Sequence, residues 1–272
     1  MTESHKLAII LLGVAAAFCS ASAHANVLFS DNFNRSTTLN NGVNFTPSNP
    51  DPGPWSNSTL NSDGSDGALS AAASNGGSGA GFRLQLDSAG EKHRISWAPT
   101  GGSEPTINNA AQYAMDIRFH DTATTGYYDL FYFNHTTGGV VTLRRFANNT
   151  IVIRAEEDGS TTGYYFGSTS TTNDVWYRIQ VTHNASEGKI NFKVTNLDTD
   201  TVMTDENWSG NISQQTTISL ANIGQNFASN SNVSGYADID NFSITEIPEP
   251  SSMGLLLSGV AACMVRNRRL HE

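Results

Sequence analysis

Residues 175–182 read Val-Trp-Tyr-Arg-Ile-Gln-Val-Thr, and residues 189–195 read Lys-Ile-Asn-Phe-Lys-Val-Thr. In both stretches apolar side chains alternate with polar ones, which is the pattern of a β-strand with one buried face. The turn residues from Asn184 to Gly188 separate the two stretches. We therefore predict an antiparallel hairpin whose core face consists of Val175, Tyr177, Ile179, Val181, Ile190, Phe192 and Val194.

The same two-residue alternation recurs through most of the chain, and no segment between the two ends shows the apolar stripe of an amphipathic helix. The region from Asn40 to Gly81 is rich in Asn, Ser, Gly and Pro, so we expect long loops around one or two short strands there. Short strands joined by such turns are typical of an all-β, antiparallel β-sandwich or jelly roll. The further predicted strands are 26–34, 82–87, 93–97, 113–119, 128–133, 141–143, 151–153 and 236–244, with a turn at Asn148-Asn149.

Both ends of the chain have the character of processing signals. Lys6 precedes an apolar run from Leu7 to Phe18, and Ala23-His24-Ala25 is an A-x-A cleavage site, which together predict a secretory signal peptide. We therefore divide the chain into a signal peptide over residues 1–25, a β-sandwich domain over residues 26–246 and a sorting or anchor segment over residues 247–272.

The C-terminal segment combines three features. Pro248-Glu249-Pro250 is followed by a mostly apolar run from Met253 to Val265 and then by the basic residues Arg266, Arg268 and Arg269. A permanent membrane helix needs about 20 apolar residues, so this short apolar helix favours a transient insertion into the inner membrane, with the arginines on the cytoplasmic side. The segment resembles the PEP-CTERM sorting signal of Gram-negative bacteria that produce exopolysaccharide. This resemblance implies an exosortase-type enzyme as a partner and the cell surface or extracellular matrix as the destination.

The central domain also resembles a known group. The order of its motifs is similar to that of concanavalin A-like lectin and glucanase domains, the laminin-G-like group. The resemblance rests on Asp31-Asn32-Phe33, the stretch 176–181, Gly188-Lys189-Ile190 and Asp240-Asn241-Phe242. The first and last strands of such folds are neighbours, which would bring Asp31 close to Asp240.

The composition excludes some classes of partner and site. The chain has 15 basic and 25 acidic residues and a formal net charge of −10, which argues against a nucleic acid partner because such binding depends on neutralising phosphates. Both cysteines, Cys19 and Cys263, lie in the terminal segments. The central domain therefore has no disulfide framework and no cysteine-ligated metal.

A structural calcium site is one hypothesis for this acidic domain. Calcium takes six to eight oxygen ligands, and Asp31, Asp238 and Asp240 would supply some of them if the first and last strands pair. The alternative is that these aspartates are turn and edge residues whose carboxylates accept hydrogen bonds from their own backbone.

Carbohydrate binding is a second hypothesis. The flat C–H faces of sugar rings pack against aromatic rings, whereas single aromatic side chains more commonly pack in a core. Trp176 begins a strand, so we expect it in the core. The candidates in or near predicted loops are Trp55, Trp97, Tyr127, Tyr164, Tyr165 and Trp208.

Catalysis has less support in the sequence. Glycoside hydrolysis needs two carboxyl groups at a fixed separation, and the nearest cluster, Glu156-Glu157-Asp158, lacks the E-x-D-x-x-E spacing of the glucanases. The four histidines of the domain are scattered without metal-ligand spacing, and we expect them to be solvated at strand ends. We predict a non-catalytic module that binds polysaccharide, with exopolysaccharide as its ligand. The alternatives are a glycan-active hydrolase of the same fold and a purely structural matrix protein.

Overall fold

The computed structural model describes fourteen segments of the chain. All regular structure in these segments is β, and the pairs of strands whose register is defined are antiparallel. The prediction of an all-β, antiparallel sandwich is confirmed. The described ranges are 26–33, 55–56, 67–70, 74–75, 81–86, 94–97, 110–120, 122–125, 127–135, 140–156, 163–184, 187–210, 218–224 and 232–247.

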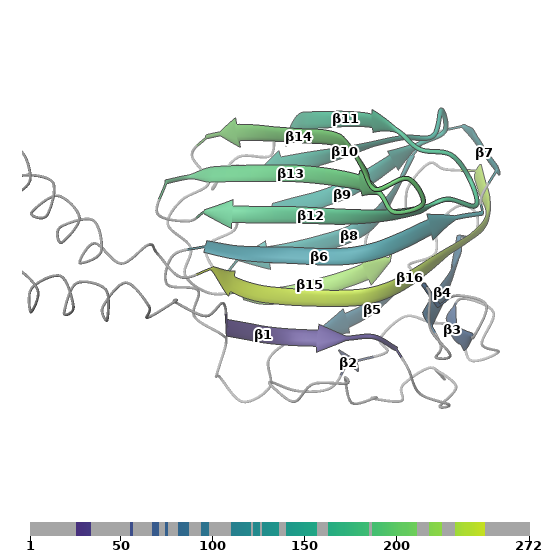
Figure 1. The fold of residues 1–272 in the computed structure, drawn as a ribbon, viewed down its shortest axis with the longest axis horizontal. Coiled ribbons are helices and arrows are strands. Elements are labelled where there is room, and N and C mark those ends of the chain that lie inside the picture. The colour runs from purple at the N-terminus through teal and green to yellow at the C-terminus, as the bar shows by residue number, and fades with distance from the viewer. Residues whose placement is uncertain are drawn as a thin grey trace, which may run out of the picture. The chain divides into compact units, whose positions relative to one another are not determined.

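Two sheets make up the unit that extends from Val27 to Glu246, and Figure 1 shows them as two layers of strands. Within the described residues, the first sheet has nine strands and the second has seven. In the first sheet the order is β14 (Thr201–Ser209), β13 (Lys189–Asn196), β12 (Trp176–Asn184), β6 (Ala110–Phe119), β16 (Asn232–Ile247), β4 (Gly81–Leu86) and β3 (Gly67–Ser70), and both β1 (Asn26–Asp31) and β7 (Thr122–Thr125) pair with β16.

The second sheet lies behind the first in Figure 1. It contains the hairpin of β9 and β10, whose turn holds Asn149 at a φ of +64°. This is the hairpin that the Asn148-Asn149 turn predicted. The order of the sheet is β11 (Gly163–Ser170), β10 (Thr150–Glu156), β9 (Val140–Phe146), β8 (Tyr127–His135), β15 (Ile218–Gly224), β5 (Arg94–Trp97) and β2 (Trp55–Ser56).

The hairpin of residues 175–195 takes its predicted form. In β12 and β13, Tyr177, Ile179, Val181, Ile190, Phe192 and Val194 are buried, and Val175 packs against their cluster. Gly188 has a φ of +61° in the turn between them, a backbone conformation that glycine adopts without strain. The predicted pairing of the first and last strands is also confirmed, because β1 pairs with β16.

The core lies between the inner faces of the two sheets. The Phe131 ring of β8 lies 5.8 Å from the Tyr113 ring of β6 and 5.7 Å from the Phe242 ring of β16, so the aromatic rings of the two layers contact one another. Burying each large apolar side chain stabilises the fold by about 1.5–3 kcal/mol. The long alternating strands therefore account for the fold, and they leave their other side chains on the two outer faces.

Trp176 departs from the sequence prediction. It is only 8% exposed, but it does not belong to the core cluster between the sheets. Its partner across the strands is Arg118, whose guanidinium carbon lies 4.8 Å from the centre of the Trp176 ring. Val175 and Tyr177 face the core, so the alternation of the strand directs Trp176 to the opposite side. Trp176 is thus buried on the outer face of the first sheet.

Candidate functional site

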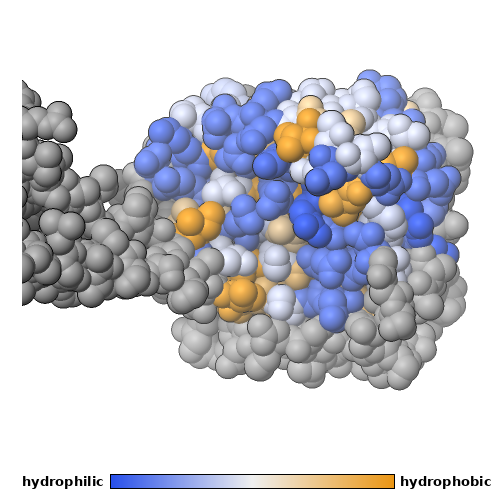
Figure 2. Space-filling view, viewed as in Figure 1, coloured by the Kyte–Doolittle hydropathy of each residue, from blue (hydrophilic) through white to orange (hydrophobic). Residues whose placement is uncertain are grey.

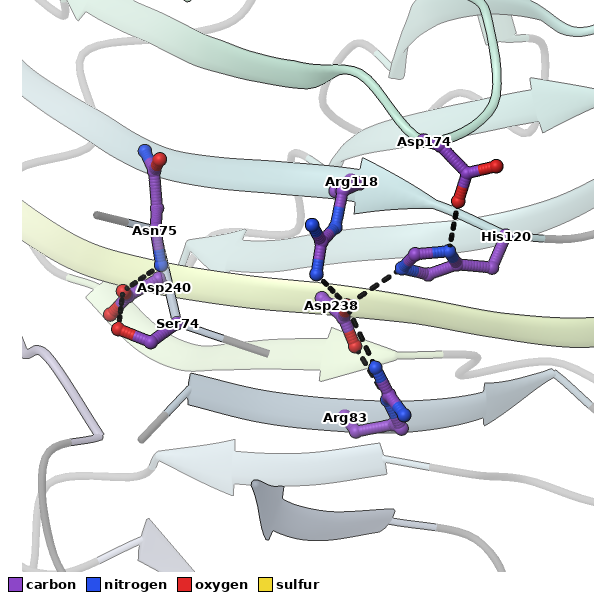
Figure 3. A network of polar contacts seen from close by, with 8 residues as sticks. All are labelled: Ser74, Asn75, Arg83, Arg118, His120, Asp174, Asp238 and Asp240. Atoms are coloured by element: carbon purple, nitrogen blue, oxygen red, sulfur yellow. Dashed lines mark hydrogen bonds and ion pairs between the residues drawn. The ribbon is translucent and has the colours of Figure 1, made fainter. Parts of the chain in front are cut away.

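The outer face of the first sheet carries a network centred on Asp238, which is fully buried. One carboxylate oxygen accepts a 2.7 Å hydrogen bond from Nε of Arg83. The other accepts bonds of 2.8 Å from Arg118 and 3.1 Å from Arg83. Figure 3 shows Arg118 and His120 on one side of β16 and Arg83 on the other, as the neighbouring strands β6 and β4 require.

His120 extends this network to Asp174. Its Nε2 lies 2.7 Å from Asp238 and its Nδ1 lies 2.5 Å from Asp174. The imidazole thus connects a fully buried carboxylate with one whose side chain is 75% exposed. The prediction that the histidines are solvated is wrong for His120, because its side chain is only 13% exposed. His183 is also buried, at 1% exposure.

Burial and hydrogen bonding have opposite effects on the pKa of Asp238. Burial alone raises the pKa of Asp238, but the hydrogen bonds from Arg83, Arg118 and His120 outweigh it and lower the pKa below its usual value. A carboxylate that binds the guanidinium groups of Arg83 and Arg118 is a poor ligand for a divalent cation, which these groups repel.

Asp240 and Asp116 lie farther along the same face and share two asparagines. Asn75 donates its backbone N–H to Asp240 at 2.8 Å and its side-chain amide to Asp116 at 2.9 Å. Asn241 likewise donates its backbone N–H to Asp240 at 2.8 Å and its side-chain amide to Asp116 at 2.9 Å. Asp116 also receives two hydrogen bonds from Arg178. Burial raises the pKa of Asp240, and the nearby Asp116 adds to the rise. Figure 3 shows Asn75 and Ser74 beside Asp240.

The predicted calcium ligands therefore have other partners. Asp31 accepts a 2.7 Å hydrogen bond from the backbone N–H of Phe33. Such a local hydrogen bond was the predicted alternative to calcium binding. Among the described residues there is no group of three or more histidine, cysteine or acidic side chains that could hold a metal ion. The calcium site on Asp31, Asp238 and Asp240 therefore stays a prediction.

Aromatic side chains form a second cluster, on the outer face of the second sheet. The Arg144 guanidinium lies 3.6 Å from the centre of the Tyr127 ring, and it donates a 2.7 Å hydrogen bond to the Tyr165 hydroxyl. Phe146 packs against both tyrosines, with ring centres 5.9 Å from Tyr127 and 6.4 Å from Tyr165. We call Tyr127, Arg144, Phe146 and Tyr165 the aromatic platform.

Asp129 holds the arginine of the platform in place. It accepts two hydrogen bonds from Arg144, of 2.7 Å and 3.1 Å, and both side chains are nearly buried. Burial lowers the pKa of Arg144, but the bond to Asp129 and the attraction of its charge leave the pKa above its usual value. The tyrosine rings are thus packed around a fixed, neutralised guanidinium, and Tyr165 remains 52% exposed.

Four of the six predicted sugar-binding aromatics have ring contacts in the structure. Tyr127 and Tyr165 share the platform. The ring centres of Tyr164 and Trp208 are 5.6 Å apart. Trp55 and Trp97 are partners in register on β2 and β5. All six lie on strands, within two residues of a strand end, and β11 and β14 were not predicted as strands from the sequence.

The roles of the arginines were missed in the sequence, and the two buried ones on β9 are examples. Arg144 follows the alternation of β9 onto the outer face, and only its pairing with Asp129 on β8 explains its role. Arg145 points to the core, continues the series Val141 and Leu143, and is fully buried. Its guanidinium lies 4.0 Å from the Phe119 ring, and burial lowers its pKa to about 10.

The predicted carboxylate cluster is described only in part. Glu156 ends β10 and forms an ion pair with Arg154. Glu157 and Asp158 lie outside the described residues, as do the signal peptide and the apolar part of the sorting segment. Within the described ranges no helix has the length and apolar character needed to cross a membrane.

Comparison with known families identifies the C-terminal segment. Residues 246–269 match the PEP-CTERM protein-sorting motif, which confirms the predicted sorting signal; the range includes Pro248, Glu249, Pro250 and the arginines at 266, 268 and 269. The motif implies export that depends on an exosortase, and sorting to the bacterial cell surface or beyond. No curated protein matches the chain in sequence.

Solved structures with a similar fold include proteins that act on carbohydrates. A carbohydrate esterase from the Shiga toxin-encoding bacteriophage phi24B has a TM-score of 0.53 at 9% identity, with 83% of this chain and 100% of that chain covered. A bifunctional GH43-CE protein of Bacteroides eggerthii has a TM-score of 0.49 at 17% identity, covering 82% of this chain and 28% of that one. The CBM2 module of the evolved Dit of Lactobacillus casei BL23 phage J-1 has a TM-score of 0.47 at 13% identity, with 82% of this chain and 97% of that chain covered.

The esterase likeness shows the sandwich fold alone. It does not single out the concanavalin A-like group, so the resemblance predicted from the strand motifs is confirmed only at the level of a β-sandwich.

Proposed function

We propose that this exported β-sandwich binds a polysaccharide of the cell surface or extracellular matrix through the aromatic platform on its second sheet, without catalysis. The observation that carries the proposal is the state of Tyr165. Its side chain is 52% exposed, although Arg144 and Phe146 hold its ring in place. A large aromatic ring that is both exposed and fixed loses little conformational entropy when a ligand packs on it.

The surroundings of Tyr165 suit a polyhydroxylated ligand. Tyr127 and Phe146 extend the ring surface, and Arg154, which pairs in register with Tyr165, supplies hydrogen-bond donors on the same outer face. The positive charges of Arg144 and Arg154 are neutralised by Asp129 and Glu156. The platform therefore offers ring faces and hydrogen bonds rather than a strong local charge.

Hydrolysis is not part of this proposal. It needs two carboxyl groups that face the scissile bond, and the carboxylates described beside the platform, Asp129 and Glu156, are each paired with an arginine. Detection of sugar products after incubation with a polysaccharide would overturn this part.

The test is a thermal melt of the purified protein with soluble xylan, soluble β-glucan, alginate and the exopolysaccharide of the producing strain. A ligand that binds only the folded state raises the melting temperature. We expect a rise with at least one polymer for the natural protein, and its loss in Tyr165→Ala. Val202→Ala is the matched control, because Val202 is 50% exposed on a different strand. The absence of any rise, or an equal rise in Tyr165→Ala, contradicts the proposal and leaves a structural matrix protein.

A further inference from the structure

The exposed large apolar side chains are unevenly distributed over the described residues. They are Val27, Tyr164, Tyr165, Val202 and Met203. Four of them lie on β11 and β14, the strands that end the second and the first sheet on one side of the sandwich. The two aromatic members are consecutive in the sequence. Tyr164 contacts Trp208 near one end of β14, whereas Val202 and Met203 lie near the other end, so the two tyrosines are the exposed aromatic groups that mark an interaction site.

Tyr164 and Tyr165 point to opposite faces of β11. Tyr165 pairs in register with Arg154 on the outer face, whereas Tyr164 pairs with Ala155, which is fully buried in the core. Tyr164 therefore turns toward the first sheet, where its ring meets Trp208 of β14. It stays 43% exposed because β11 is the last strand of its sheet.

The region where β11 meets β14, which we call the seam, holds the Tyr164 ring firmly. Trp208 stacks on Phe166 with ring centres 6.0 Å apart and planes at 16°. Glu206 of β14 accepts the backbone N–H of Gly167 at 3.1 Å, which joins the two strands through a side chain. Gly167 has a φ of +66°, and a Cβ there would lie 2.2 Å from the Phe192 ring, so the close approach of the sheets requires glycine.

We infer that Tyr164 and Trp208 form a second subsite for the ligand of the aromatic platform, so that a polysaccharide chain crosses the edge of β11 and packs on Tyr165 on one side and on Tyr164 on the other. This inference rests on the proposed function. Rings on opposite faces of one strand cannot stack on the same sugar, but they can contact sugars farther along one flexible chain. The hydroxyls of Ser168 and Ser170, both exposed, lie on the same edge strand.

A second copy of the protein is a less suitable occupant of this edge. Antiparallel pairing of two β14 strands would bring Asp205 and Glu206 of one copy close to those of the other, and like charges on neighbouring strands are destabilising. The net charge of −10 adds to this repulsion. An uncharged glycan chain meets neither obstacle.

Two subsites make affinity depend on the length of the ligand. A short oligosaccharide fills the platform alone, whereas a long chain occupies both subsites, and the second contact is then intramolecular. The experiment compares binding of the natural protein, Tyr164→Ala, Tyr165→Ala and Val202→Ala to a polymer that raises the melting temperature and to its disaccharide and hexasaccharide, by isothermal titration calorimetry. Circular dichroism melts of each variant control for folding.

We expect Tyr164→Ala to weaken polymer binding by about tenfold or more and to leave disaccharide binding within about twofold. Tyr165→Ala should abolish disaccharide binding. If Tyr164→Ala binds the polymer as tightly as the natural protein, while Tyr165→Ala does not bind it, the second subsite is wrong and the platform stands. If Tyr165→Ala binds every ligand normally, the proposed function itself fails. A change of oligomeric state in Tyr164→Ala alone would assign the seam to a second copy and overturn the inference.

Discussion

The two outer faces of the sandwich contain the same elements in different surroundings. Each has a buried aspartate that binds an arginine, and in each the arginine lies against an aromatic ring. On the first sheet Asp238 holds Arg118 over Trp176, which is 8% exposed. On the second sheet Asp129 holds Arg144 against Tyr165, which is 52% exposed. We therefore propose that what covers the aromatic neighbour of such an ion pair decides whether the pair contributes to stability alone or also to ligand binding.

The charges of the first face also stay within the protein. Asp238 has two arginines and a histidine around it, and Asp116 and Asp240 share Asn75 and Asn241. Figure 2 shows this face as mostly hydrophilic, with smaller hydrophobic patches between the polar residues. The buried carboxylates of this face bind neighbouring strands and segments to one another. We therefore expect mutations of these carboxylates to lower the stability of the protein and not its affinity for a ligand.

The largest expected effect is that of Asp238→Asn. This substitution removes the negative charge that Arg83 and Arg118 bind, and breaking a buried ion pair in this way costs about 3–5 kcal/mol. Because the two arginines are partly exposed, we expect about 3 kcal/mol of unfolding free energy to be lost. Urea denaturation followed by tryptophan fluorescence measures it.

Asp205→Asn is the matched control for this variant. Asp205 is half exposed and lies 3.9 Å from Lys193, a surface pair whose loss should change the unfolding free energy by less than about 1 kcal/mol. Equal effects in the two variants would mean that the Asp238 network is not a structural centre of the first face.

Asp129→Asn makes the same chemical change on the second face and should have two effects. We expect a loss of about 2 kcal/mol of unfolding free energy, because only one arginine loses its partner. We also expect weaker polysaccharide binding, because Arg144 is no longer held against Tyr127 and Tyr165. Titration calorimetry at a temperature where both variants are folded separates the two faces: binding should fall in Asp129→Asn and persist in Asp238→Asn.

Acidification is a smaller perturbation of the first face, and its sign differs between two of its aspartates. The pKa of Asp238 is lowered in the folded protein, so its contribution to stability is complete above its usual pKa of 3.8 and is lost as the pH falls through the lower folded value. The pKa of Asp240 is raised, so its contribution is present below its usual pKa and is lost as the pH rises through the raised value.

Urea midpoints of the natural protein, Asp238→Asn and Asp240→Asn between about pH 3 and pH 7 test these signs. Below about pH 4, Asp238→Asn should lose less stability on acidification than the natural protein. The stability advantage of the natural protein over Asp240→Asn should grow as the pH falls. Parallel curves for all three proteins would show that neither carboxylate changes its pKa on folding.

Much of the fold was predictable because alternation is a local property. The strict pattern of β12 and β13 gave the faces of both strands, and the Asn148-Asn149 turn gave the hairpin of β9 and β10. The same alternation places Arg145 inside, in series with Leu143, although an arginine is not an expected core residue. The local pattern does not predict the contact between the Arg145 guanidinium and the Phe119 ring of the other sheet, which lowers the cost of burying this arginine.

The sites were less predictable for the same reason. Asp238 is one of three aspartates that suggested calcium, but its partners Arg83 and Arg118 are more than a hundred residues away in the sequence. Tyr165 was a candidate only as an aromatic residue near a loop, and nothing in its neighbours indicates Arg144. Long-range pairing decides whether an acidic or aromatic residue is structural or available to a ligand, and a single sequence does not contain it.

The smallest expected effects come from paired substitutions that keep each aromatic ring. Tyr165→Phe removes the acceptor of the Arg144 hydrogen bond, which contributes about 1 kcal/mol, but leaves the ring face for the ligand. We expect binding to weaken by about fivefold or less, far less than in Tyr165→Ala.

Trp176→Phe keeps a ring beneath Arg118 and should leave binding unchanged, with a loss of stability of about 1 kcal/mol. If Tyr165→Phe abolishes binding, the hydroxyl and not the ring face is recognised, and the contrast between an exposed and a covered ring no longer explains the two faces.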